Sequence, residues 1–112
     1  KKYSLKSKIV LDCFQSNHEG EIIDYIQARL YNSFGMIINA GALSHSSLAL
    51  RDCLQVFQGL IYEVHISNIY SRELYRRKSY ISEVSNGVIC GLGMSGYEIA
   101  IDAIKKIREK YV

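Results

Sequence analysis

The chain has 112 residues, of which 48% are hydrophobic and 22% charged, and its formal net charge is +3. This length suits one core, so we expect a single domain over residues 1–112. The mild positive charge, without interleaved aromatic side chains, argues against nucleic acid as a partner. No apolar run is long enough to cross a bilayer, so a membrane partner is not expected either. The three cysteines are widely spaced and lie in apolar runs, so we expect them to be small core residues. This use of cysteine is typical of a reducing compartment, the cytoplasm, and predicts neither a disulfide framework nor a metal site.

Four short runs rich in isoleucine and valine predict parallel strands that are buried on both faces, over residues 8–14, 36–39, 60–66 and 87–91. Apolar side chains at helical spacing predict helices over residues 21–31, 46–58 and 97–111, and Ser71 would begin a short helix over residues 71–77. Strands that alternate with helices in this way are typical of a doubly wound α/β fold.

Among doubly wound folds, we expect a flavodoxin-like three-layer αβα sandwich with a parallel sheet. In that strand order the first strand lies in the centre of the sheet and the second at its edge. A chain that starts on the edge strand leaves the centre unfilled. We therefore expect that the first central strand is missing from this sequence and precedes Lys1.

Polar side chains follow two of the predicted strands. The strand over residues 60–66 carries Glu63 and His65 and runs into Ser67, and the strand over residues 36–39 ends at Asn39, with His45 close behind. The carboxyl ends of parallel strands meet at one edge of a sheet, where ligands bind. A capped strand with a hydrogen-bonded surface histidine would explain either strand alone, but the two together predict a site.

An arginine-rich segment lies downstream of this predicted site. Arg72 and Arg76 are four residues apart and would share one face of a helix, where they are able to bind an anion. The alternative is that these arginines are solvated and balance Glu63 and Glu73. Both interpretations stay open at this point.

Other motifs argue against several classes of chemistry. Residues 91–96, GLGMSG, match a dinucleotide-binding pattern, but that fold needs a further strand with an acidic residue, so a tight turn is the better interpretation. The segment 17–21 lacks the second histidine of a zinc helix and predicts a helix entry. No serine lies in a nucleophile elbow, no lysine lies in an apolar strand and no cysteine adjoins a histidine, so covalent catalysis is disfavoured. What remains is acid–base chemistry by His65 on a small, hydroxylated, anionic substrate.

Several segments, in order along the chain, resemble type II 3-dehydroquinate dehydratase. They are FQSNHEGE (14–21), INAGALSH (38–45), LRD (50–52), IYEVHISN (61–68), RELYRRKSY (72–80) and GVICGLG (87–93). The resemblance implies a flavodoxin-like fold and trimers that assemble into a dodecamer. It also implies the dehydration of 3-dehydroquinate to 3-dehydroshikimate, in the shikimate pathway of aromatic amino acid biosynthesis or in quinate breakdown. Neither a metal nor an organic cofactor is implied.

The same resemblance implies roles for individual residues. His65 matches the proton donor to the leaving hydroxyl, Glu63 the carboxylate that orients it, and Asn39 the amide that binds substrate and a water near the enolate oxygen. Further substrate contacts match His45, Ile66, Ser67 and Arg76. Asp52 matches a residue that reaches the substrate of a neighbouring subunit, and together with Arg72 it would support the interface and the lid.

Three features of the family have no counterpart in this sequence: the first strand, an asparagine-rich loop, and a lid that carries an arginine and the catalytic tyrosine. Tyr3 does not match that tyrosine, so we expect the general base to lie upstream of this sequence. The alternative is a truncated, non-catalytic relative that binds ligand or assembles without turnover.

Overall fold

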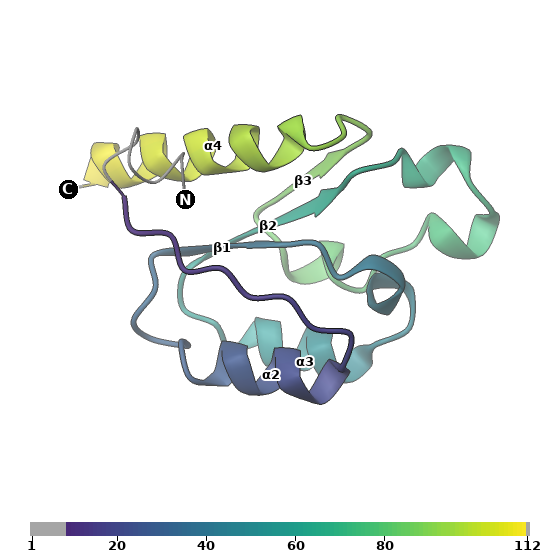
Figure 1. Ribbon diagram of the computed structural model, residues 1–112, viewed down its shortest axis with the longest axis horizontal. Coiled ribbons are helices and arrows are strands. Elements are labelled where there is room, and N and C mark those ends of the chain that lie inside the picture. The colour runs from purple at the N-terminus through teal and green to yellow at the C-terminus, as the bar shows by residue number, and fades with distance from the viewer. Residues whose placement is uncertain (1–8, 112) are drawn as a thin grey trace.

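The computed structural model describes residues 9–111 (Figure 1). Three parallel strands form one sheet in the order β1-β2-β3, with bounds Gly35–Ile38, Leu60–His65 and Gly87–Cys90. The α-helices are α2 (Glu19–Gln27), α3 (Leu48–Gln55) and α4 (Ser95–Tyr111). Short 3-10 helices lie between them: η1 (Gly41–His45), η2 (Ile69–Ser71), η3 (Leu74–Arg76) and η4 (Ser82–Val84).

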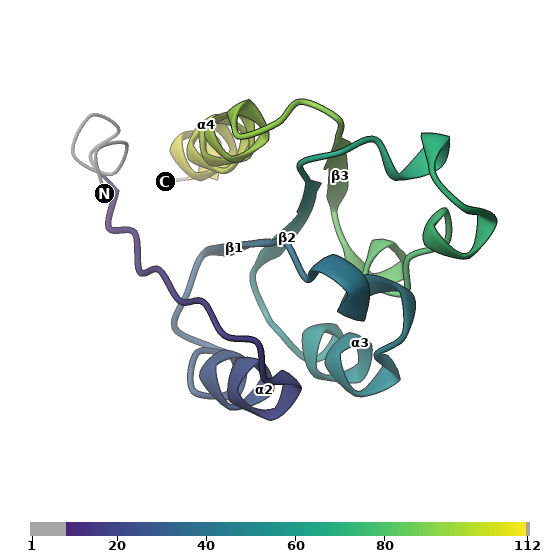
Figure 2. The same ribbon diagram turned by 45° about the vertical axis from the view of Figure 1, so that its right-hand side comes forward.

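The helices cover both faces of the sheet. Figures 1 and 2 show α4 on one face and α2 with α3 on the other, so the three layers and the parallel sheet of the flavodoxin-like prediction are confirmed. Within the described residues, no helix is both long and apolar enough to cross a membrane.

The strand predicted over residues 8–14 is wrong for the described part, 9–14, which has no regular secondary structure, and Lys8 lies outside the described residues. A strand needs a neighbour with free backbone groups, and this segment is instead attached to α2 through side chains. Arg29 donates to the Asp12 carboxylate at 3.0 Å, and the Phe14 ring stacks on Tyr25 with the centroids 4.3 Å apart. Cys13 is exposed in consequence, so the expectation of a core residue is wrong there.

The helix predicted over residues 71–77 is also wrong, because the chain forms two separate 3-10 turns, η2 and η3. Arg72 and Glu73 between them have extended backbone, with ψ of −168° and 151°, which interrupts any continuous helix. The glycine-rich turn after β3 is confirmed as a turn: Gly91 and Gly93 have φ of +82° and +58°, values that favour glycine.

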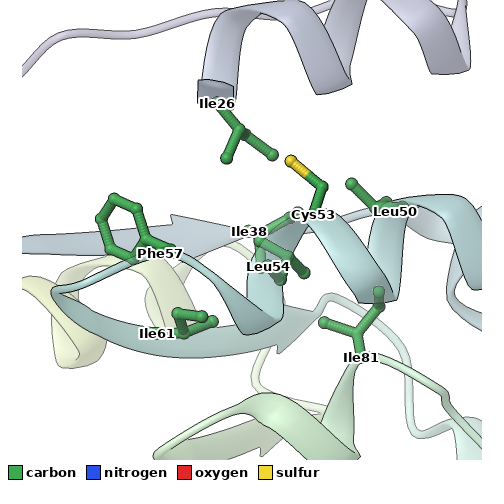
Figure 3. Close-up of a cluster of buried hydrophobic side chains, with 8 residues drawn as sticks. All are labelled: Ile26, Ile38, Leu50, Cys53, Leu54, Phe57, Ile61 and Ile81. Atoms are coloured by element: carbon green, nitrogen blue, oxygen red, sulfur yellow. The ribbon is translucent and has the colours of Figure 1, made fainter. Parts of the chain in front are cut away.

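The largest buried cluster fills the space between the sheet and the α2/α3 layer (Figure 3). It comprises Ile26, Ile38, Leu50, Cys53, Leu54, Phe57, Ile61 and Ile81. Leu50 and Ile81 are completely buried, so this packing ties the segment before η4 to the sheet and to α3. Cys53 is a core residue, as the sequence predicts.

The core predicts that truncating two leucines of α3 lowers the free energy of unfolding by clearly different amounts. Leu50 is 0% exposed and Leu48 is 56% exposed. We expect Leu50→Ala to lower the free energy of unfolding by about 3 kcal/mol, through lost burial and the cavity it leaves. Leu48→Ala serves as the matched control and should cost less than about 1 kcal/mol. Urea unfolding followed by circular dichroism measures both values, and equal losses would contradict this account of the core.

Candidate functional site

A cavity of about 310 Å³ opens at the carboxyl edge of the sheet. The chain leaves this edge through the loop after β2, which Figure 2 shows extending away from the sheet toward η2 and η3. Seven of the residues that the sequence predicted for a site line the cavity: Asn39, His45, His65, Ile66, Ser67, Arg72 and Arg76. The topology therefore brings together residues that are almost 40 positions apart in the sequence.

Glu63 and His65 form a buried pair, of which His65 lines this cavity. Side chains two residues apart on a strand point to the same face, and here His65 Nε2 lies 2.5 Å from Glu63 Oε2. Glu63 is 0% exposed and His65 5%. Because Nε2 is hydrogen-bonded to the carboxylate, Nδ1 is the ring nitrogen left for a ligand.

Two serines that sequence reasoning missed complete the surroundings of Glu63. Ser79 Oγ donates to Glu63 Oε2 at 2.6 Å, and Ser82 Oγ donates to Oε1. Burial by itself would raise the pKa of Glu63, but the hydrogen bonds from His65, Ser79 and Ser82 outweigh it and lower the pKa below its usual value. No local motif marks these serines, because they reach Glu63 only through the tertiary fold.

The Asn39 amide is held at both ends. Its Oδ1 accepts the backbone N–H of Gly41 at 3.2 Å, and its Nδ2 donates to the Tyr97 hydroxyl at 2.8 Å. Each amide nitrogen carries two hydrogens, so one remains for a ligand. Tyr97 was not predicted, since it comes from α4, the layer on the opposite face of the sheet.

His45 is also oriented by the backbone. Its Nδ1 lies 2.8 Å from the carbonyl oxygen of Lys78, which only accepts, so Nδ1 carries the hydrogen and donates it. Nε2 is then the nitrogen available to a ligand. The ring centroids of His45 and His65 are 6.2 Å apart, so the two imidazoles lie on the same cavity.

Arg72 and Arg76 line the cavity and at the same time face Glu73. Nε of Arg76 is 3.1 Å from Glu73 Oε1, and Nε of Arg72 is 3.7 Å from the same oxygen. The backbone N–H of Glu73 and then these two guanidinium groups lower the pKa of its carboxyl. Of the two acids proposed to balance the arginines, Glu73 does so and Glu63 is instead bound to His65.

Asp52 lies outside the cavity. It belongs to α3, its side chain is 71% exposed, and it forms an ion pair of 3.3 Å with Arg51. Within the described residues it does not approach the other residues predicted for the site. Among residues 9–111, no group of three histidine, cysteine or acidic side chains is arranged to hold a metal ion.

Comparisons with known proteins give one consistent result. A family model described as dehydroquinase class II matches residues 1–105. The 3-dehydroquinate dehydratase of Halothermothrix orenii is 52% identical over 103 residues, which make up 92% of this chain and 70% of that protein. The type II dehydroquinase structure from Butyrivibrio crossotus has 46% identity and a TM-score of 0.88, covering 92% of this chain and 72% of that one. The type II dehydroquinase structure from Propionibacterium acnes has 31% identity and a TM-score of 0.90, with 94% and 72% covered.

The buried Glu63 predicts a pH dependence of stability. Its pKa in the folded chain lies below the ordinary 4.5, so its stabilising contribution is complete above 4.5 and is lost as the pH falls through the folded value. We expect Glu63→Gln to be less stable by roughly 3 kcal/mol at pH 7 and to approach the wild type as the pH falls below about 4.5. Urea unfolding between pH 3 and 7 tests this. The exposed Asp102→Asn is the control, and a constant gap between wild type and Glu63→Gln would contradict the prediction.

Proposed function

Because this chain belongs to the class II dehydroquinase family, we propose that it is a hydro-lyase that dehydrates 3-dehydroquinate to 3-dehydroshikimate. The observation that carries the proposal is the buried Glu63–His65 pair, which faces a cavity lined by two arginines. This combination suits an anionic substrate that must lose a hydroxyl group.

The proposed reaction is an anti elimination through an enolate. A general base removes the proton next to the ketone, and the electron pair moves into the carbonyl to form the enolate. The enolate then collapses to the double bond while the hydroxyl on the neighbouring carbon leaves. Protonated His65 gives that hydroxyl a proton from Nδ1, so that water is the leaving group. Glu63 keeps the ring oriented through its hydrogen bond to Nε2.

Substrate contacts follow from the donors around the cavity. Arg76, supported by Arg72, would bind the substrate carboxylate, which would then compete with Glu73 for the guanidinium groups. Asn39 would donate its free amide hydrogen toward the enolate oxygen or its bound water. His45 Nε2, the Ser67 hydroxyl and the backbone at Ile66 would contact the hydroxyl groups of the substrate.

We assign the general base to a tyrosine, as the family resemblance implies. The cavity lining contains no tyrosine. Asp52, exposed on α3, would reach the active site of a neighbouring subunit in a trimer, and trimers would assemble into a dodecamer. No organic cofactor or metal has a step in this mechanism. We place the reaction in the cytoplasm, which the three free cysteines support.

The first test concerns the proton donor. We expect His65→Ala to lower kcat by about 10² to 10⁴ while 3-dehydroquinate binding is largely retained, since the histidine acts on the leaving group. The rise in enone absorbance measures turnover, and the intact mass is recorded on the same sample. Exposed His18→Ala should keep the wild-type rate. A wild-type rate for His65→Ala would contradict the assignment. Ligand binding without turnover by a wild-type chain of 12.8 kDa would support the non-catalytic alternative.

A second test concerns the anion contact. Removing a hydrogen-bonded charge partner costs about 1.5–3 kcal/mol, so Arg76→Ala should weaken 3-dehydroquinate binding by roughly 10- to 100-fold. Titration calorimetry measures the dissociation constant in a His65→Ala background, where turnover is slow, with and without the Arg76→Ala change. Arg77→Ala is the matched control, because Arg77 is the next residue and its Nε donates to the Arg72 carbonyl. An unchanged dissociation constant for Arg76→Ala would exclude the carboxylate contact.

A further inference from the structure

Glu63 is a completely buried carboxylate, and its charge is tolerated only if its oxygens are hydrogen-bonded. His65 takes one position on Oε2. The serines reach the two oxygens separately, Ser79 at Oε2 and Ser82 at Oε1. His65 approaches from β2, Ser79 from the segment before η4 and Ser82 from the first position of η4, so the three donors define the orientation of the carboxylate in space.

The Ser79 hydroxyl has its own orientation determined by the backbone. Its Oγ accepts the N–H of Ile81 at 3.2 Å and that of Ser82 at 3.4 Å. These two bonds use its lone pairs, so its single hydrogen is directed to Glu63. The segment itself is anchored, because Ile81 is 0% exposed in the core and the N–H of Tyr80 donates to the Ser44 carbonyl at 2.8 Å.

We propose that Ser79 and Ser82 are positioning residues for the proposed dehydration: they hold Glu63 so that it accepts the Nε2 hydrogen of His65 and leaves Nδ1 facing the substrate. This inference rests on the proposed function. Neither serine lines the cavity, so both act through Glu63 and His65 rather than on the substrate.

The other ionisable groups near this network are few. Cys90 on β3 lies opposite His65 in the sheet register, and its pKa is raised by burial and then by the negative charge of Glu63. His45 lies on the cavity side of His65. Arg51 on α3 pairs with Glu83, the residue after Ser82, at 2.9 Å. None of these groups has a hydrogen bond to the Glu63 carboxylate among those of the described residues.

The test compares Ser79→Ala, Ser82→Ala and the double variant with Ser85→Ala. Ser85 is the matched control, since it lies in the same segment but its Oγ donates to the Ile81 carbonyl at 2.7 Å. Carbon-13 NMR follows the titration of the Glu63 carboxyl. Loss of one donor should raise its midpoint by about one pH unit, and loss of both should raise it further, whereas Ser85→Ala should leave it unchanged.

A second readout of the positioning role is the tautomer of neutral His65, which nitrogen-15 NMR measures. The wild type should carry the hydrogen on Nε2, and the serine variants should show a mixture with Nδ1. Ser82→Thr retains a hydroxyl and should restore both signals. In the active protein we expect kcat to fall about tenfold in Ser82→Ala, with KM little changed.

The outcomes separate this inference from the proposed function. An unchanged Glu63 midpoint in Ser82→Ala, or an equal shift in Ser85→Ala, overturns the positioning role. Altered spectra with a wild-type kcat overturn it too. If the wild type never turns over 3-dehydroquinate but the serine variants still shift the spectra, the proposed function is overturned. The role of the serines in holding Glu63 then remains. If Ser79→Ala does not fold, because Ser79 also binds two backbone N–H groups, Ser82→Ala alone decides.

Discussion

The structure depends on one constraint, the burial of the Glu63 carboxylate in the middle strand of a parallel sheet. A charge removed from water costs several kcal/mol unless hydrogen bonds replace its hydration. Donors come from two directions: His65 from the same strand, and Ser79 and Ser82 from the segment before β3. The hydrogen bonds that allow the charge to stay buried also orient the histidine, so stability and chemistry rest on the same groups.

Topology explains why so small a chain gathers several polar side chains at one edge of the sheet. Parallel strands all end on the same side, and each crossover helix returns the chain to the opposite side. Asn39 follows β1, His65 ends β2, and both therefore lie on the same cavity. The arginines come from the loop after β2, where short 3-10 turns replace a helix and the Glu73 carboxylate pairs with Nε of both guanidinium groups.

Several features were accessible from the sequence and others were not. Apolar runs with polar ends predicted β1, β2 and β3, and the positions of His65 and Asn39 at their ends follow from strand geometry. The run at residues 9–14 has the composition of a strand, yet pairing depends on a neighbour that composition does not report, and the segment packs on α2 instead. The sequence predicted a short helix at residues 71–77 that begins at Ser71, but the extended backbone at Arg72 and Glu73 prevents one.

The sequence by itself determined the three strands β1, β2 and β3, the helices α2, α3 and α4, and the family to which the chain belongs, because periodicity and motif are local properties. Only the tertiary structure decided which groups meet. Ser79 and Ser82 on Glu63, and Tyr97 on Asn39, are separated from their partners by 16 to 58 positions. Such contacts arise from the packing of whole layers, with Ile81 in the core and α4 across the sheet, and no local pattern carries that information.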